Sequence, residues 1–284
     1  MKTRPSILLL GANGFIGRNI KEAWSGQYDL SAPPHKELDL LNAQTVEGYL
    51  REGHFDVVLH TANTNNVTHP DQAPHMLEYN LRMFCNLERC RNLYGKLLYF
   101  GSGAEYDMRH YIPRMTEAYF GRHVPQDPYG FSKYVMSKLA TGNIYDLRLF
   151  GVFGKYEEWR RRFISNMIYQ NLTGRVMEIK QNMYFDYLYI GDLLSILEWF
   201  LTHEPARHHY NVCSGQRYEL LSLAHMVVEE TGIPGEIVIR QEGLKPEYTG
   251  DNTRLLAEAG GLSLTPMRTA VRELTAYYRE NGFH

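Results

Sequence analysis

Residues 6–17 read Ser-Ile-Leu-Leu-Leu-Gly-Ala-Asn-Gly-Phe-Ile-Gly, and this stretch decides the fold. The run Ser6–Leu10 is short, aliphatic and ended by a glycine, which is typical of a strand buried inside a parallel sheet. Apolar residues then recur at helical spacing over Phe15–Trp24. A buried strand that passes through a glycine turn into a helix predicts the opening of an α/β sheet.

The turn itself holds three glycines, and each has a physical task. Gly11 permits the tight turn, Gly14 lets the backbone approach a pyrophosphate without a Cβ, and Gly17 lets the helix pack closely on the strand. The helix N-terminus adds N–H groups and the positive end of its dipole. We therefore predict a dinucleotide site; the alternative is a tight strand–helix turn without a ligand. The turn residues expected at the cofactor are Gly11, Asn13, Gly14, Phe15, Ile16 and Gly17.

Strands and helices keep alternating through the first half of the chain. Further strands are predicted at 28–31, 56–59, 97–100 and 144–149, and further helices at 43–51, 74–94 and 129–140. This alternation predicts a doubly wound, Rossmann-like parallel sheet with helices on both faces. The pattern loosens after residue 150, where helices are expected at 160–172, 187–200 (after a strand-like start), 221–230 and 266–278.

This change in pattern predicts a division of the chain. We expect a dinucleotide-binding domain over residues 1–150, to which residues 186–204 return. Residues 151–185 and 205–284 are expected to form a smaller C-terminal substrate-binding lobe.

The composition argues against several classes of function. Lysine and arginine number 30 and aspartate and glutamate 32, so the net charge of -2 gives no electrostatic reason to bind nucleic acid or an anionic membrane. Three irregularly spaced cysteines and 12 histidines without ligand spacing predict neither a disulfide framework nor a metal site. No apolar run approaches the length of a membrane span, and Met1–Pro5 lack the pattern of a signal peptide, so a cytoplasmic location is expected.

The end of the second predicted strand bears on the choice of cofactor. A Rossmann site for NAD usually places an acidic residue there, on the ribose hydroxyls. This chain instead reads Ser-Ala-Pro-Pro-His-Lys over residues 31–36, without a carboxylate. Ser31, His35 and Lys36 could receive a 2′-phosphate, which favours NADP, with NAD as the alternative. The competing interpretation is that His35 and Lys36 are solvated loop residues.

Tyr129, Lys133 and Ser102 are the candidate catalytic residues. Tyr129 and Lys133 share one face of a predicted helix, and an ammonium beside a phenol favours the phenolate. Such a tyrosine can exchange a proton with a carbinol or ketone while hydride moves to or from nicotinamide. Ser102 follows the fourth strand, where its hydroxyl can polarise the reacting oxygen. The structural alternatives are surface decoration for the pair and a turn residue for Ser102.

Together these features resemble the extended short-chain dehydrogenase/reductase family, the group of sugar-nucleotide epimerases, dehydratases and 4-ketoreductases. The resemblance rests on the glycine turn, on Ser102 four residues before Tyr106, and on Tyr129 with Lys133. It implies an NAD(P)-dependent enzyme in which Lys133 also holds the nicotinamide ribose. The family pattern places further residues at the cofactor: Asp39 and Leu40 beside adenine, Thr61, Ala62 and Asn63 along the cofactor, Asn80 in support, and Phe150 near nicotinamide.

Departures from the family pattern narrow the reaction. The 4,6-dehydratases have acidic residues just after the serine, where this chain has Gly103 and Ala104. Glu105 is one position late, and in an extended segment it would point to the other side. Fucose-synthase-like enzymes have a cysteine at the position of Ala104. We therefore expect hydride transfer alone, without dehydration and without epimerisation of the carbons next to the reacting carbon.

Other departures concern the grip on the substrate. The family pattern implies substrate contacts at Ala104 and Gly151, but it often has an asparagine at the position of Gly151 and an arginine at the position of Phe185. Arg160, Arg161 and Arg162 are candidate replacements, because guanidinium groups suit phosphates. The alternative is a solvated basic turn.

Three functions remain open from the sequence. The first is a reductase acting at C4 of a nucleotide-linked deoxysugar, and the second is a 4-epimerase that retains NAD. The third is a non-catalytic dinucleotide-binding sensor, since fold does not fix function. The resemblance also implies a homodimer in which helices 77–94 and 129–140 of two subunits pair.

Overall fold

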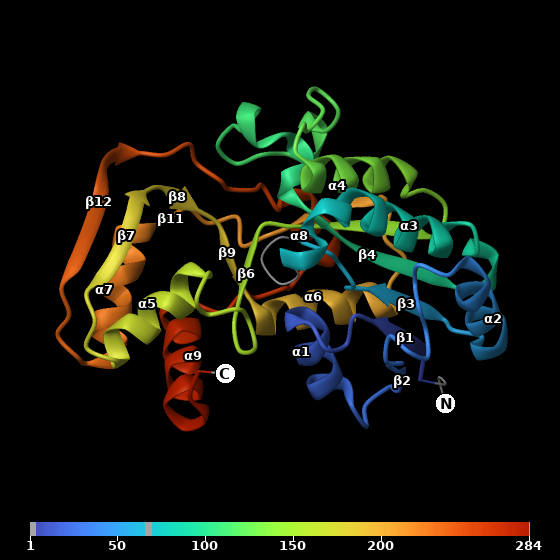
Figure 1. The fold of residues 1–284 in the computed structure, drawn as a ribbon, viewed down its shortest axis with the longest axis horizontal. Helices are drawn as coiled ribbons and strands as arrows, with labels where there is room; N and C mark the ends of the chain where they lie inside the picture. Colours follow the sequence, from blue (N-terminus) through green and yellow to red (C-terminus); the bar gives the residue numbers. More distant parts are fainter. Residues whose placement is uncertain (1–3, 66–69, 284) are drawn as a thin grey trace. The chain divides into compact units, whose positions relative to one another are not determined.

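The computed structural model describes residues 4–65 and 70–283 and forms two compact units (Figure 1). The predictions for the opening Met1–Thr3 lie outside the described residues. The first unit runs to His110 and adds Glu117–Leu149 and Trp199–Tyr210. The second consists of Tyr111–Thr116, Phe150–Glu198 and the chain from Asn211 onward.

These boundaries differ from the predicted ones in two places. Residues 199–210, rather than 186–204, join the first unit, where Lys96 Nζ donates to the carbonyl oxygens of Phe200 (3.0 Å) and His203 (2.8 Å). Residues 111–116 belong to the second unit, because the Met115 backbone N–H donates to the carbonyl of Thr249 at 2.9 Å. Both differences arise from contacts between distant parts of the sequence.

The first unit is built on a six-stranded sheet in the order β10-β5-β4-β3-β1-β2. Its strands are β1 (Ser6–Leu10), β2 (Asp29–Ser31), β3 (Val57–His60), β4 (Lys96–Ser102), β5 (Ile144–Leu149) and β10 (His209–Val212). The pairs from β2 through β5 are parallel, with Leu8 opposite Val58 in the register of β1 and β3. The predicted Rossmann-like sheet is confirmed, and β10 is an edge strand that the sequence did not predict.

Helices cover both faces of this sheet. They are α1 (Phe15–Trp24), α2 (Ala43–Gly53), α3 (Met76–Glu88) and α4 (Pro128–Leu139). Figure 1 shows α3 and α4 on one face and α1 on the other. The predicted helix 74–94 was too long: Pro74 lies in a separate 3₁₀ helix, and the chain turns again after Glu88. Proline lacks the N–H that an α-helix interior needs, which accounts for the later start.

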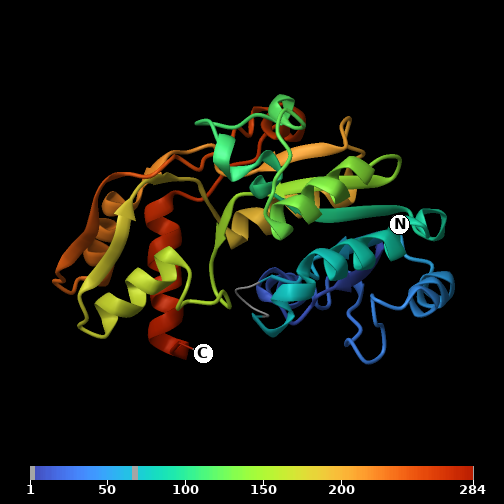
Figure 2. The ribbon, with the colours of Figure 1, turned by 45° about the horizontal axis from the view of Figure 1, so that its top comes forward.

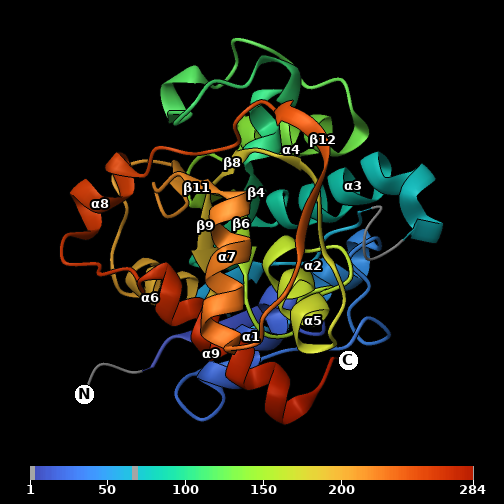
Figure 3. The ribbon, with the colours of Figure 1, turned by 90° about the vertical axis from the view of Figure 1, so that its left-hand side faces the viewer.

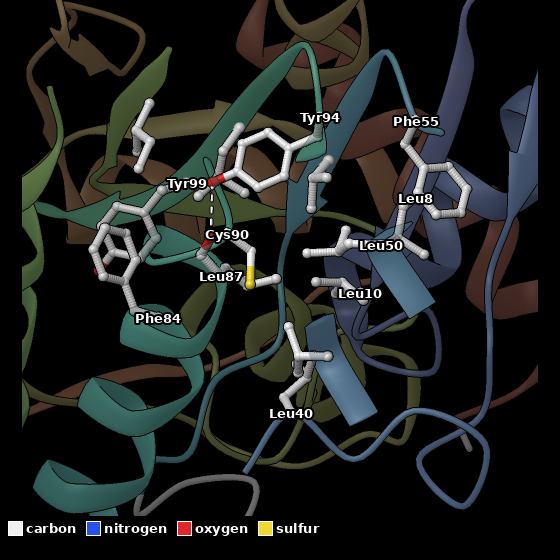
Figure 4. Close-up of a cluster of buried hydrophobic side chains, with 14 of the residues drawn as sticks. Leu8, Leu10, Leu40, Leu50, Phe55, Phe84, Leu87, Cys90, Tyr94 and Tyr99 are labelled. Carbon is white, nitrogen blue, oxygen red and sulfur yellow. Dashed lines mark hydrogen bonds between the residues drawn. The ribbon is translucent and has the colours of Figure 1, made fainter. Parts of the chain in front are cut away.

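The core of the first unit lies between the sheet and α2 and α3 (Figure 4). Leu8 and Leu10 of β1 point to this side because alternate strand residues share a face. Leu50 of α2 and Phe84 of α3 pack into the same cluster. This buried layer fixes the strands, and therefore the loops that follow them.

The second unit contains three short strand pairs and a group of helices. The strands are β6 (Gly151–Phe153) with β9 (Tyr187–Tyr189), β7 (Met177–Asn182) with β12 (Ile237–Leu244), and β8 (Tyr184–Phe185) with β11 (Tyr218–Glu219). The helices are α5 (Phe163–Leu172), α6 (Ile190–Thr202), α7 (Leu220–Thr231), α8 (Thr253–Ala259) and α9 (Met267–Asn281). The last turn of α6, from Trp199, already belongs to the first unit. Helices α5, α7 and α9 pack together, with α5 and α7 against β7 (Figure 3). Among the described residues, none of the helices has the length and apolar character that crossing a membrane requires.

Candidate functional site

The glycine turn between β1 and α1 is closely packed. Gly11 has a φ of +83°, and a Cβ on it would lie 2.6 Å from the backbone nitrogen of Ala62. A Cβ on Gly17 would lie 2.2 Å from the carbonyl oxygen of Gly11. Glycine is therefore required at both positions, which the sequence predicted at this turn.

The turn fits a dinucleotide phosphate. Within the described residues, no side chain caps α1 at Gly14, and Asn13 and Gly14 are exposed. The helix N-terminus and its dipole therefore face outward at a place without a competing side-chain acceptor. Phe15 and Ile16 follow in the first turn of α1 and are half-buried.

The loop after β3 is held beside this turn. Thr61 Oγ1 donates to the carbonyl oxygen of Leu10 at 2.7 Å. Asn80 of α3 is buried, and its side chain bonds both the N–H and the carbonyl of Thr64 at 2.8 Å. Asn63 Oδ1 is buried and has no hydrogen-bond partner in the described part of the chain. A polar atom of this kind needs a ligand or water, which is consistent with a cofactor along this loop.

The residues expected at the adenosine end lie after β2. His35 has an exposed side chain, and its Nε2 lies 3.6 Å from Asp39 Oδ1. Lys36 is exposed as well, whereas Leu40 is buried in the core. The other Asp39 contact is local, because Oδ1 accepts the N–H of Leu41 at 2.9 Å. His35 and Lys36 are thus accessible from solvent.

The three candidate catalytic residues come from two neighbouring elements. Ser102 ends β4, while Tyr129 and Lys133 lie in α4, which begins with Asp127 as its cap. Lys133 Nζ donates to the carbonyl oxygen of Phe100 at 2.8 Å and lies 5.8 Å from the centre of the Tyr129 ring. A Cβ on Gly130 would lie 2.9 Å from the carbonyl oxygen of Ala104. The first turn of α4 therefore contacts the segment that follows Ser102.

The charge state of Lys133 is set by its burial. Burial lowers the pKa of the Lys133 ammonium to about 8, and the carboxyl groups of Glu105 and Asp146 partly offset this shift. Lys133 therefore still carries a charge near neutral pH. An ammonium at this position favours the ionised form of a neighbouring phenol.

The sequence predicted that Glu105 points away from Ser102, and this prediction was wrong. Residues Gly103–Tyr106 form a 3₁₀ helix (η3), not an extended segment, so strand alternation does not apply. Glu105 Oε1 accepts the backbone N–H of Ser102 at 2.9 Å, and Ser102 Oγ accepts the N–H of Ala104 at 3.1 Å. Because this bond uses Ser102 Oγ as an acceptor, the hydroxyl proton can be donated to a substrate oxygen.

Sequence reasoning missed a buried ionic cluster behind Ser102. Asp146 and Arg148 lie in β5, and both are fully buried together with Glu105. The available signal was the sequence Ile-Tyr-Asp-Leu-Arg-Leu over residues 144–149, which places two charges in a strand that is otherwise apolar or aromatic. Charged residues are rarely buried unless they are paired, so such a strand predicts an internal partner.

The remaining predicted residues belong to the second unit. A Cβ on Gly151 would lie 2.5 Å from the carbonyl oxygen of Asp186, so packing requires glycine where the family often has asparagine. The Phe150 ring packs 5.2 Å from the Tyr248 ring. Arg161 and Arg162 are exposed just before α5. The predicted helix 160–172 begins only at Phe163, and the three arginines precede it in a turn in which the Glu158 carbonyl oxygen accepts the N–H groups of Arg161 and Arg162 at 3.1 and 3.2 Å.

His60 at the end of β3 is buried near Lys133, and its titration tests how strongly burial acts at this place. Burial and the nearby Lys133 charge lower the pKa of His60 from 6.5 to about 3. Between these two values the unfolded chain binds one more proton than the folded chain, so stability is lost as the pH falls. We expect the His60→Leu variant to lose this contribution, which reaches about 1.4 kcal/mol per pH unit. Urea unfolding at pH 7 and pH 4 measures how much the free energy of unfolding changes with pH. An equal change in the wild type and in His60→Leu would contradict the lowered pKa of His60.

Comparisons with known proteins show which family and which relatives this chain resembles. Residues 7–213 match the model of the NAD dependent epimerase/dehydratase family. The GDP-6-deoxy-D-mannose reductase of Pseudomonas aeruginosa is 26% identical over 262 residues, covering 82% of each chain. The GDP-L-colitose synthase of Yersinia pseudotuberculosis is 23% identical, covering 96% of this chain and 97% of its own. A GDP-L-fucose synthetase structure from Naegleria fowleri bound to NADP superposes with a TM-score of 0.85 at 15% identity, covering 99% of this chain and 94% of that one.

Proposed function

Because the chain belongs to the NAD-dependent epimerase/dehydratase family, we propose that it is an NADPH-dependent 4-ketoreductase of a nucleotide-linked deoxysugar. The observation that supports this most is the contact between the start of α4 and the segment after Ser102, with Lys133 bonded to the backbone of β4. This contact supports the proposal because the helix that carries Tyr129 and Lys133 lies against the segment after Ser102, at the carboxyl end of a parallel strand, where ligands of such sheets bind.

Each of the three residues has a separate task in the proposed reduction. Ser102 donates a hydrogen bond from its hydroxyl to the ketone oxygen, keeps its proton and polarises the carbonyl. Tyr129 gives up its phenolic proton to the same oxygen as the alcohol forms, and the Lys133 ammonium stabilises the phenolate that results. NADPH, when bound, supplies the hydride to the carbon. The carbonyl thus gains one hydride and one proton.

Dehydration is disfavoured by the residues beside Ser102. Gly103 and Ala104 have no group that transfers a proton. The Glu105 carboxyl is buried and bonded to Ser102 N–H and Arg148, so it is directed into the protein interior. Ala104 stands where fucose-synthase-like enzymes have the cysteine that helps to epimerise the carbons next to the reacting carbon. Simple reduction is the reaction these residues support.

The nucleotide and the cofactor are proposed from different observations. Relatives named for GDP-linked sugars cover most of this chain, which favours a guanosine diphosphate substrate. His35 and Lys36 are exposed after β2, in a stretch without the usual carboxylate, which favours NADP over NAD. The homodimer remains an expectation; α3 and α4, which lie side by side, are the helices through which it would form (Figure 2).

The proposed function predicts that the purified protein oxidises NADPH when it is given a GDP-linked 4-keto-6-deoxyhexose. Loss of absorbance at 340 nm, as expected for nicotinamide oxidation, measures the rate, with NADH and a dTDP-linked ketone as comparisons. No turnover with any of a panel of nucleotide-linked ketones would contradict the reductase. Release of tightly bound NAD from protein purified without added cofactor would instead support the 4-epimerase.

A further inference from the structure

A fully buried guanidinium lies behind the candidate site. Arg148 Nε donates to Glu105 Oε2 at 2.8 Å and to Asp146 Oδ2 at 2.9 Å. Its two terminal nitrogens donate to Tyr106 Oη at 2.9 Å and to Ser137 Oγ at 2.8 Å. The group also lies 4.2 Å from the centre of the Phe120 ring. We call Glu105, Ser137, Asp146 and Arg148 the Arg148 cluster.

One end of the Arg148 cluster holds Ser102. Glu105 accepts the Ser102 backbone N–H through Oε1 and the Arg148 guanidinium through Oε2. The same carboxyl group therefore fixes the N–H of the candidate serine and joins it to β5. A shift of Glu105 would move the backbone from which the Ser102 hydroxyl projects.

The other end holds the helix with the tyrosine and lysine. Ser137 Oγ donates to Asp146 Oδ2 at 2.7 Å. Ser137 lies four residues after Lys133 in α4, so the two side chains share one face of the helix. Lys133 in turn bonds the β4 backbone two residues before Ser102. A continuous set of bonds thus runs from Ser102 through Arg148 to α4.

The two carboxyl groups meet over Gly101. A Cβ there would lie 2.0 Å from Asp146 Oδ1 and 2.5 Å from Glu105 Oε1. Burial and the Asp146 charge raise the pKa of Glu105 well above its usual value. Burial also opposes ionisation of Asp146, but Arg148, His209 and Ser137 outweigh it and hold the Asp146 pKa below its usual value. The pKa values of the two carboxyl groups are therefore shifted in opposite directions.

A contribution to the stability of the folded protein does not by itself explain why the Arg148 cluster is buried. Two carboxyl groups and a guanidinium lose their hydration when they are buried, and well-packed apolar residues often stabilise a core as well or better. A buried ionic network does, however, impose directions and distances that apolar packing does not. The cluster connects the two elements whose relative position the proposed chemistry requires.

We propose that the Arg148 cluster positions the Ser102 hydroxyl against the Tyr129–Lys133 face of α4, so that its members are positioning residues for ketone reduction. The inference rests on the proposed reductase and deepens it. None of the cluster residues is assigned to the substrate or the cofactor. Their effect is exerted through Ser102 on one side and through Lys133 on the other.

The test removes a single hydroxyl, with its two hydrogen bonds, and changes the side-chain volume only slightly. Ser137→Ala deletes the hydroxyl that joins α4 to Asp146 and Arg148, and kcat should fall by about 10- to 100-fold because the reacting groups are misplaced. The KM for the ketone and the Kd for NADPH should stay within about twofold, since uniform binding is unaffected. Ser137→Thr, which keeps the hydroxyl, should recover most of kcat.

A matched control deletes a buried hydroxyl elsewhere. Thr231 of α7 donates to Asn171 Oδ1 at 2.5 Å in the second unit. Thr231→Val should lower stability about as much as Ser137→Ala while leaving kcat unchanged. If both variants lower stability and neither lowers kcat, the cluster is only structural and the proposal is overturned.

The pH profile gives a readout that a purely structural role would not change. The groups around Lys133 are Glu105, Asp146, His60, Tyr99 and Tyr129. Asp146→Asn removes the anion that favours the ammonium, so the alkaline limb of kcat/KM should move to lower pH. Glu105→Gln removes the other carboxyl group that raises the Lys133 pKa, so it should move the limb in the same direction. An unmoved limb in both variants would overturn the coupling of the Arg148 cluster to Lys133.

Crystal structures separate failure of this inference from failure of the proposed function. If the wild-type protein reduces no nucleotide-linked ketone, the proposed function fails and kcat is uninformative. The structure of Ser137→Ala then decides, because the proposal requires a changed separation between Ser102 Oγ and Lys133 Nζ. A larger separation than in the wild type supports the cluster as a positioning device, and an unchanged separation overturns it.

Discussion

Replacing Tyr129 by phenylalanine will reduce ketone turnover by about 100- to 10,000-fold, the range lost when a positioned general acid is removed. The ring remains and only the proton donor is lost, so the packing of α4 should be preserved. NADPH binding should stay near the wild-type Kd, because the glycine turn that is expected to hold the phosphates lies in another loop. Single-turnover kinetics and a fluorescence titration with NADPH measure the two quantities.

Tyr134→Phe is the matched control for this variant. Tyr134 lies in the same helix, is half-buried and packs 4.9 Å from the Phe120 ring. The Tyr134→Phe variant loses an equivalent phenolic hydroxyl, and its rate of ketone turnover should equal that of the wild type. An undiminished rate in Tyr129→Phe would remove the phenol from the mechanism. NADPH binding without turnover in the wild type and both variants would instead support the non-catalytic sensor.

The second large effect is expected at the glycine turn. A Cβ on Gly17 would lie 2.2 Å from the Gly11 carbonyl oxygen and 2.8 Å from Ala12 Cα. These are backbone atoms of the turn itself, so α1 must move away from β1 to accommodate alanine. We expect Gly17→Ala to lower the free energy of unfolding by about 1–3 kcal/mol, as overpacking of a core does. NADPH affinity should fall at least about tenfold because the phosphate-facing N–H groups are displaced.

Gly48→Ala, in the same unit, is expected to change the free energy of unfolding in the opposite direction. Gly48 lies inside α2, and nothing lies within 4 Å of a Cβ placed on it. Alanine there should raise the free energy of unfolding by about 0.5–1 kcal/mol, because glycine is a poor residue for a helix interior. Urea unfolding of both variants and NADPH titration measure these effects. A stable Gly17→Ala protein with wild-type affinity would refute the close packing of the turn.

Local patterns predicted the first unit well. The strand Ser6–Leu10, the helix Phe15–Trp24 and the strand Ile144–Leu149 have the bounds expected from the sequence. Each is a strongly periodic or continuous apolar segment, in which neighbours along the chain determine the structure. The helix predicted over 74–94 was less accurate, because apolar spacing continued past the turn at which α3 ends.

The second unit was less predictable from the sequence. Its strands are short, and β12 is mostly exposed, so apolar alternation is weak there. Strand β10 pairs with β5 across the 59 residues of chain that lie between Leu149 and His209. Pairings of this kind depend on the completed sheet and leave little trace in a local window.

The sequence by itself determined the α/β sheet, the glycine turn and the types of group proposed for the chemistry, because each depends on residues within a few positions of one another. Only the tertiary structure decided where Glu105 points and that Arg148 joins it to Asp146. Glu105 and Arg148 are 43 positions apart, and their ion pair forms because β4 and β5 are neighbours in the sheet. No local periodicity reports such a partner, since burial and pairing are properties of the packed chain.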